Sequence, residues 1–212
     1  LDIQKDISKA YAILKNNPNN KQADQNLKSL MGRKIILLGT LQNKLNVLKE
    51  NLEDKKPENY TLFYVSGDYQ SESFKPAITK TQQILNKIGW KTSKFTGEES
   101  KPDREVILEN FKNSVVNGMV AIKCLDEGVD IPACKTAFIL ASSKASREFI
   151  QRRGRVLRQC PEIGKEEAVI YDFVTIIPKI QSTQGFGREI QKEEFKRVYE
   201  FRRFSNNEWD AY

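Results

Sequence analysis

The sequence has no histidine, and its three cysteines, Cys124, Cys134 and Cys160, lack the C-x-x-C spacing of common metal sites. Acid–base catalysis by an imidazole is therefore excluded, and so is a zinc site, because the usual nitrogen and paired thiolate ligands are missing. An odd number of cysteines also argues for a reducing compartment rather than a disulfide framework. We therefore expect a cytoplasmic protein without a bound structural metal.

Long apolar runs are absent as well. No stretch approaches the roughly 20 apolar residues that a membrane-spanning helix needs, and we expect no secretory signal peptide. We therefore expect no membrane partner. The chain opens with Leu1 rather than methionine, and we expect it to be a piece of a longer protein.

Basic residues are more numerous than acidic ones. The chain holds 35 Lys+Arg against 28 Asp+Glu, for a net charge of +7. This balance favours an acidic partner, of which nucleic acid is the most common, although a solvated basic surface explains it equally well. With 212 residues, the chain can bury one core, with or without a helical appendage.

Residues 1–56 are predicted to be a helical lead-in. Apolar residues recur at helical spacing through residues 1–15, a polar loop follows at 16–25, and the pattern over 27–52 indicates one long helix or two helices broken at Gly39-Thr40. A coiled coil is the alternative, but its repeat would be short.

From residue 57 to 178 short apolar runs alternate with helical segments. Helices are predicted at 77–88 and 102–116, the second with Val106, Leu108 and Phe111 turned inward. The five apolar runs are 61–66, 93–95, 119–124, 136–142 and 168–174. This alternation is typical of an α/β domain, a doubly wound parallel sheet that binds ligands at the carboxyl ends of its strands. Residues 179–212 are predicted to be a C-terminal helical tail.

Two segments carry residues suited to phosphate chemistry. Residues 149–159, FIQRRGRVLRQ, hold four arginines around one glycine, and guanidinium forks suit phosphate oxygens. In residues 123–134, KCLDEGVDIPAC, Gly128 lets the backbone approach a phosphate, and the Asp130 carboxylate could accept from a ribose hydroxyl. A solvated nucleic-acid patch and an ordinary strand-to-helix turn are the respective alternatives.

In order along the chain, these segments resemble the second motor domain of superfamily 2 helicases and translocases. The resemblance is strongest to bacterial excision-repair helicases and to the motor subunits of type I and type III restriction enzymes. It covers residues 34–174 and implies a RecA-like fold. Motif V is matched by EGVDIP at 127–132, and motif VI by QRRGRVLR at 151–158. The motif IV strand is similar to TLFYVS at 61–66. The segment in which a glycine precedes R-x-x-x-L-x-x-F resembles residues 95–111.

The resemblance implies a role for each matching residue. Arg155 and Arg158 would be arginine fingers that reach the γ-phosphate of ATP, an interaction that can be worth roughly 10³–10⁵ in rate. Gln151 and Arg152 would help place these fingers in the catalytic site. The cofactor-binding residues would be Glu127, Gly128 and Asp130, the last at the ribose. Phosphates of nucleic acid would meet residues at three strand ends, which could equally be simple turn residues: Ser66, Gly67, Thr96, Gly97, Lys123 and Cys124.

Two parts of a complete ATPase site are missing from the chain. It has no G-x-x-x-x-G-K-[ST] loop and no Walker B segment to hold Mg²⁺. ATP with Mg²⁺ is therefore expected to be bound mainly by an N-terminal RecA-like domain of the same protein, and this chain alone should be inactive. We interpret the chain as the C-terminal motor domain of an ATP-dependent DNA helicase or translocase.

Two other interpretations remain. The chain could be a non-catalytic basic RecA-like module that binds nucleic acid or a protein, although Arg155 and Arg158 argue against this. It could also be a structural helical adaptor built on residues 27–52.

Overall fold

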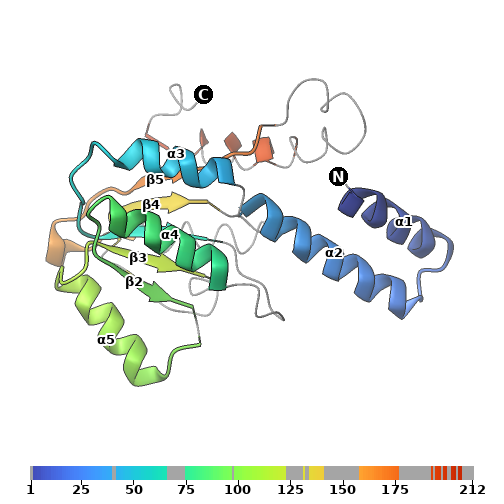
Figure 1. Ribbon diagram of the computed structural model, residues 1–212, viewed down its shortest axis with the longest axis horizontal. Coiled ribbons are helices and arrows are strands. Elements are labelled where there is room, and N and C mark those ends of the chain that lie inside the picture. Colours follow the sequence, from blue (N-terminus) through green and yellow to red (C-terminus); the bar gives the residue numbers. More distant parts are fainter. Residues whose placement is uncertain are drawn as a thin grey trace. The chain divides into compact units, whose positions relative to one another are not determined.

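The computed structural model describes residues 2–39, 42–65, 75–96, 98–122, 131, 134–140 and 158–176, and also 192, 194–196, 198, 199, 202, 203, 205 and 206 (Figure 1). The chain divides into two compact units, residues 1–31 with 172–212 and residues 32–171. The second unit contains almost all of the sheet and the candidate site. The limits predicted for the three regions, 1–56, 57–178 and 179–212, stay predictions.

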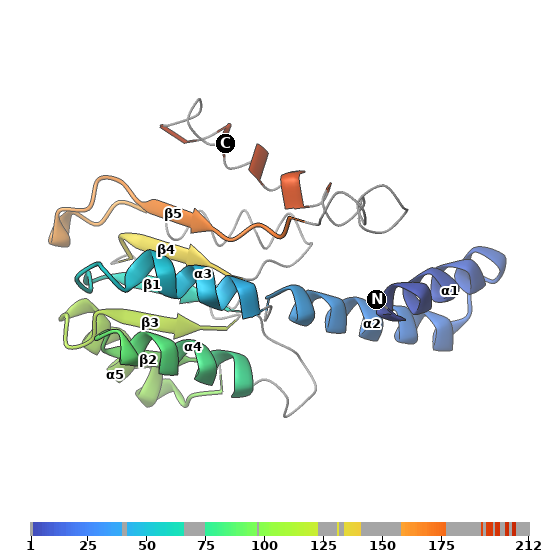
Figure 2. The same ribbon diagram turned by 45° about the horizontal axis from the view of Figure 1, so that its top comes forward.

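Five strands form one sheet in the order β2-β3-β1-β4-β5. Their bounds are β1 Thr61–Tyr64, β2 Thr92–Phe95, β3 Gly118–Ala121, β4 Thr136–Ile139 and β5 Val169–Asp172. β1 pairs in parallel with β3 and β4, and β2 pairs in parallel with β3. β5 runs in the same direction at the edge beside β4 (Figure 2). The predicted doubly wound parallel sheet is confirmed, because the chain crosses β1 on its way from β3 to β4.

The centre of the sheet is the hydrophobic core. β1, β3 and β4 are buried along their whole length, as expected where helices cover a parallel sheet. The rings of Phe63, Phe138 and Tyr171 stack across β1, β4 and β5, with centroids 5.2 and 4.6 Å apart. Trp90 meets Phe63 edge-on at 5.1 Å. Such aromatic pairs contribute about 0.5–1.5 kcal/mol each beyond the area they bury, so this row ties the β5 edge to the centre.

Within the described part of the chain, three helices cover the sheet. α3 (Gln42–Leu52) and α4 (Lys75–Lys87) lie side by side on one face (Figures 1 and 2), and α5 (Lys101–Lys112) packs against β2. Their buried side chains recur at helical spacing, which gives α3 and α4 one apolar side each. These side chains are Leu45, Leu48 and Leu52 on α3, and Ile78, Thr81 and Leu85 on α4.

Helix α5 differs from its prediction in its inward face and in its end. Phe111 is buried as predicted, but Val106 is 55% exposed, because five residues of helix turn it about 140° away from Phe111. The helix ends at Lys112 rather than near Val116, since Ser114 adopts the left-handed backbone conformation with φ of 58°.

The N-terminal helices α1 (Asp2–Asn16) and α2 (Lys21–Gly39) form a hairpin. Ile7 and Ala10 of α1 pack against Leu27 and Leu30 of α2. The polar loop is shorter than predicted, because Asn20 caps α2 by accepting a hydrogen bond from the N–H of Ala23 at 3.0 Å. Since α2 ends at residue 39 and α3 begins at residue 42, the predicted pair of helices is confirmed.

Three further findings concern the described residues. No helix among them is long and apolar enough to cross a membrane. Of the predicted C-terminal helix, residues 192, 194–196, 198, 199 and 202 are helical. The helix that the sequence predicts for the arginine cluster lies outside the described residues except for Arg158, which is not helical.

Candidate nucleic-acid and nucleotide site

Four strands of the sheet end at the same level. Their register aligns the last residues of each strand: Tyr64, Phe95, Ala121 and Ile139. The ladder holds for one residue more, through hydrogen bonds of 2.9–3.0 Å donated by the N–H groups of Val65, Ile122 and Leu140. The chain therefore leaves β1, β2, β3 and β4 along one common edge, which we call the carboxyl edge.

Three residues predicted to contact nucleic acid come directly after the strands that end at this edge. Thr96 is the first residue after β2, Lys123 follows Ile122, and Ser66 follows Val65. The structure describes Thr96, while Ser66 and Lys123 lie outside the described residues. The other predicted residues that fall outside them are Gly67, Gly97, Cys124, Glu127, Gly128, Asp130, Gln151, Arg152 and Arg155.

The hydrogen-bond donors of Thr96 are engaged by Glu99. The Thr96 N–H donates to both carboxylate oxygens of Glu99, at 2.9 and 3.0 Å, and the Thr96 hydroxyl donates to one of them at 2.8 Å. The Glu99 carbonyl in turn accepts from Arg104 Nε at 3.0 Å. Backbone N–H groups and hydroxyls are also donors that bind nucleic-acid phosphates. A phosphate at Thr96 would therefore compete with the Glu99 carboxylate.

Lys44 reaches the carboxyl edge from α3, and sequence reasoning gave it no role. Its side chain is 7% exposed, and its Nζ donates to the carbonyl oxygen of Leu140 at 3.0 Å. A buried ammonium group is unfavourable unless it is hydrogen-bonded. The available signal was its spacing of four residues from Leu48, which places a lysine on the apolar side of α3.

Among the predicted arginines, the structure describes Arg158, whose side chain is exposed. Two residues later, Cys160 exchanges backbone hydrogen bonds of 3.1 and 3.0 Å with Lys165. The Glu162 carboxylate within this turn accepts from Lys112 of α5 at 2.6 Å. This hydrogen bond and the charge of Lys112 lower the pKa of Glu162, and the same contact raises the pKa of Lys112. An exposed ion pair therefore connects the turn that follows Arg158 to the end of α5.

The described residues suit anion binding better than covalent or metal chemistry. The exposed Arg158 guanidinium can meet a phosphate. Burial raises the pKa of the Cys134 thiol to about 12, so this thiol is no nucleophile at neutral pH. Among the described side chains, no group of three or more His, Cys, Asp or Glu could hold a metal ion.

Residues 43–160 match the model of the helicase conserved C-terminal domain. The chain belongs to the superfamily 2 helicases. It is 31% identical over 134 residues to the DNA 3'-5' translocase XPB2 of Sulfurisphaera tokodaii, a match that covers 63% of this chain and 27% of that protein. It is 33% identical over 92 residues to the type I restriction enzyme EcoKI endonuclease subunit of Escherichia coli, covering 42% of this chain and 8% of that protein.

Two solved domains share the RecA-like fold of this chain. The C-terminal domain of the DEAD-box protein Dbp5 gives a TM-score of 0.53 at 15% identity and covers 76% of this chain and 78% of its own. The C-terminal part of the Fun30 ATPase domain gives 0.51 at 13% identity, covering 95% and 74%. The chain spans about a quarter of XPB2, or 27%, and 8% of the EcoKI subunit.

Proposed function

We propose that the chain is the C-terminal motor domain of an ATP-dependent DNA helicase or translocase. The observation that carries this proposal is the carboxyl edge, where β1, β2 and β3 end in register just ahead of Ser66, Thr96 and Lys123. Open α/β sheets bind their ligands at this edge. The match of residues 43–160 to the helicase C-terminal domain supports the same role.

Nucleic acid is proposed to run along the carboxyl edge. Donors at strand ends bind phosphates without distinguishing bases, so binding should depend on salt and hardly on sequence. The net charge of +7 supports such a contact. We propose DNA rather than RNA because the relative XPB2 is named a DNA translocase. The contacts proposed next to Ser66, Thr96 and Lys123 are Gly67, Gly97 and Cys124.

The nucleotide role is proposed for the motif V and motif VI residues. Arg155 and Arg158 would stabilise charge on the phosphoryl group in transit. The supporting residues would be Gln151, Arg152, Glu127, Gly128 and Asp130. ATP with Mg²⁺ would be bound mainly by an N-terminal RecA-like domain of the same protein, since this sequence contains no phosphate-cradling loop.

Two measurements on the isolated chain test this function. Fluorescence anisotropy with single-stranded DNA should show weak binding that falls steeply as salt rises, and phosphate release with ATP should show no turnover. The full-length protein should hydrolyse ATP, and nucleic acid should stimulate it.

Each part of the proposal has its own contradicting result. Salt-independent or strongly sequence-selective binding would contradict the nucleic-acid role. Robust turnover by the isolated chain would contradict the proposal that this chain holds only part of the ATPase site. DNA binding by a full-length protein that never hydrolyses ATP would favour the non-catalytic module.

A further inference from the structure

The segment from Lys75 to Gly97 contains five lysines and no aspartate or glutamate. Acidic residues border it closely, at Glu72 and at Glu98-Glu99. The segment comprises α4 and the edge strand β2, which pack against each other. Helix α5, on the other side of β2 in sequence, has three acidic and three basic residues. In this part of the chain, the excess of positive charge therefore lies on α4 and β2 and not on α5.

Hydrogen bonds align α4 with β2. Gln82 Nε2 donates to the carbonyl oxygen of Thr92 at 2.9 Å, and Lys94 Nζ lies 3.4 Å from Thr79 Oγ1. Lys94 therefore stands on the side of β2 that α4 covers. Its ammonium group lies beside the helix rather than on the opposite face of the sheet.

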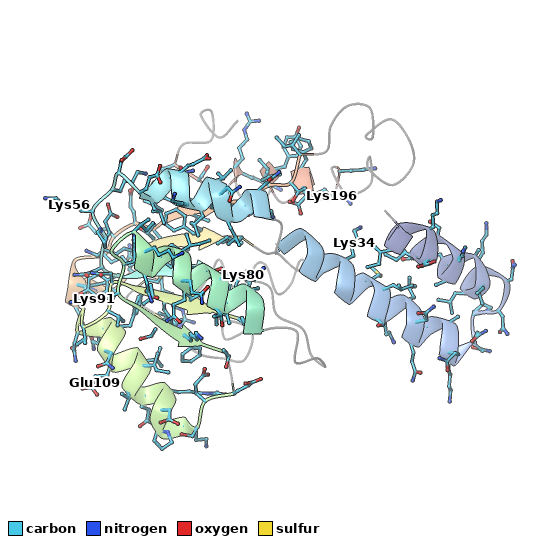
Figure 3. The ribbon with its side chains drawn as sticks, viewed as in Figure 1. Lys34, Lys56, Lys80, Lys91, Glu109 and Lys196 are labelled. Carbon is cyan, nitrogen blue, oxygen red and sulfur yellow. The ribbon has the colours of Figure 1, made fainter. Side chains whose placement is uncertain are left out.

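Four lysines of this segment have exposed side chains, and we call them the lysine strip: Lys80, Lys87, Lys91 and Lys94. Lys80 and Lys87 are two helical turns apart on α4, roughly 10 Å along its axis, and so share one side of the helix. Lys91 directly precedes β2, and Figure 3 labels it together with Lys80.

The lysine strip is not neutralised by the acidic residues that the structure describes. Lys28, Lys49 and Lys112 each form an ion pair with a carboxylate, whereas no member of the strip pairs with a described carboxylate. Ordinary soluble surfaces intersperse both signs of charge. Four ammonium groups on adjoining elements raise the local positive potential, which favours a polyanion.

The lysine strip approaches the carboxyl edge at Lys94, whereas Lys87 and Lys91 lie near the beginning of β2. Lys94 is two residues ahead of Thr96, where β2 reaches that edge. We propose that the strip binds the phosphodiester backbone of nucleic acid beyond the carboxyl edge, as a second contact region over α4 and β2. This inference rests on the proposed nucleic-acid function. Lysine presents a compact charge without a planar fork, so the contribution is electrostatic and independent of base sequence.

Paired substitutions test the lysine strip. Lys80→Gln with Lys87→Gln keeps the helix propensity of α4 and lowers the net charge from +7 by 2, to +5. Lys21→Gln with Lys56→Gln removes the same charge from exposed lysines outside the strip and serves as the control. Lys91→Gln with Lys94→Gln is a second strip variant with no substitution in α4, although it removes the contact of Lys94 with Thr79. Circular dichroism checks that each variant is folded.

The readout is the salt dependence of binding to single-stranded DNA, measured by fluorescence anisotropy on the isolated chain. Each single-strand phosphate contact contributes about 0.7 to the slope of log K against log salt. Because each strip variant removes two lysines, its slope should fall by about 1.4, and it should bind roughly 25-fold more weakly at about 0.1 M salt. The control pair should retain the slope of the parent chain.

Two results overturn the proposal while leaving the carboxyl edge intact as a DNA site. One is parental binding by both strip variants. The other is an equal loss of slope in the strip and control pairs, which would indicate a diffuse effect of net charge. Failure of the parent chain to bind DNA at all is a distinct result, because it contradicts the nucleic-acid function itself.

Discussion

The ammonium group of Lys44, on α3, donates a hydrogen bond to the main-chain carbonyl of Leu140, just past β4, across 3.0 Å. Both residues are buried. The contact joins the helix that leads into the sheet to the strand end that precedes residues 141–157. It therefore stabilises the end of β4, where the chain leaves the sheet toward the predicted arginines.

Lys44→Ala should lower the free energy of unfolding by about 1–3 kcal/mol, because it leaves a buried carbonyl without this donor. Lys49→Ala on the same helix is the control. Its pair with Glu53, at 3.3 Å, is exposed, so its loss should change stability by no more than about 0.5 kcal/mol. Urea unfolding of the isolated chain measures both. Equal effects of the two substitutions would show that the Leu140 contact adds nothing.

Glu99→Gln should raise the affinity for single-stranded DNA by about 3–10-fold, since a neutral amide competes less well than a carboxylate for the Thr96 donors. Glu98→Gln is the control, because it removes the same charge from the neighbouring residue. Glu98 contacts the Thr96 hydroxyl through its N–H, at 3.2 Å, and not through its carboxylate. Anisotropy at a single salt concentration compares the two. If they bind alike, Glu99 acts through its charge alone and does not occupy the phosphate position.

Gly118→Ala should destabilise the sheet by about 1–3 kcal/mol through overpacking. An added Cβ on β3 would lie 2.8 Å from Cε2 of Phe63, a ring held in the core. In a Phe63→Leu background the same substitution should be less harmful, because the clashing atom is gone. A double-mutant cycle in urea measures this coupling, and strictly additive effects would rule out the clash.

The contact between Lys112 and Glu162 should contribute stability within a defined pH window. The lowered pKa of Glu162 means that its contribution is present above the ordinary carboxyl pKa and is lost as pH falls through the lowered value. The raised pKa of Lys112 means that its contribution is complete below the ordinary lysine pKa and is lost as pH rises through the raised value. Both side chains are exposed, so the effect should be small.

An NMR titration tests this pair directly. Lys112→Gln should return the pKa of Glu162 to its ordinary range, because the first cause of the shift is the hydrogen bond from Lys112. A Glu162 pKa that stays low in the variant would assign the shift to other groups.

The sheet was predictable from sequence because its central strands are buried on both faces. β1, β3 and β4 are continuous apolar runs, and such runs between helices indicate parallel strands. Helix faces and ends were harder to predict. Val106 was expected to face inward because it is apolar, and the loop at 16–25 was predicted too long because the polar residues after Asn20 form an exposed helical turn.

Some contacts around the candidate site join residues that are far apart in the sequence, and others join close neighbours. Lys44 and Leu140 are 96 positions apart, so nothing local in the sequence could pair them. Thr96 and Glu99 are three residues apart, the spacing of a capping box, although the N-cap of α5 is Ser100 and not Thr96. That contact could have been predicted. The roles of the arginines rest on motif resemblance, because most of them lie outside the described residues.

The central claim is that motif VI serves ATP hydrolysis. The most direct test is nucleic-acid-stimulated ATP turnover by the full-length protein carrying Arg155→Ala, with Arg153→Ala as the control. We expect Arg155→Ala to lower turnover at least about a hundredfold and to leave DNA affinity nearly unchanged, while Arg153→Ala stays within a few-fold of the parent. An Arg155→Ala protein that keeps its turnover but loses DNA binding would make the arginine cluster a nucleic-acid patch and contradict the account.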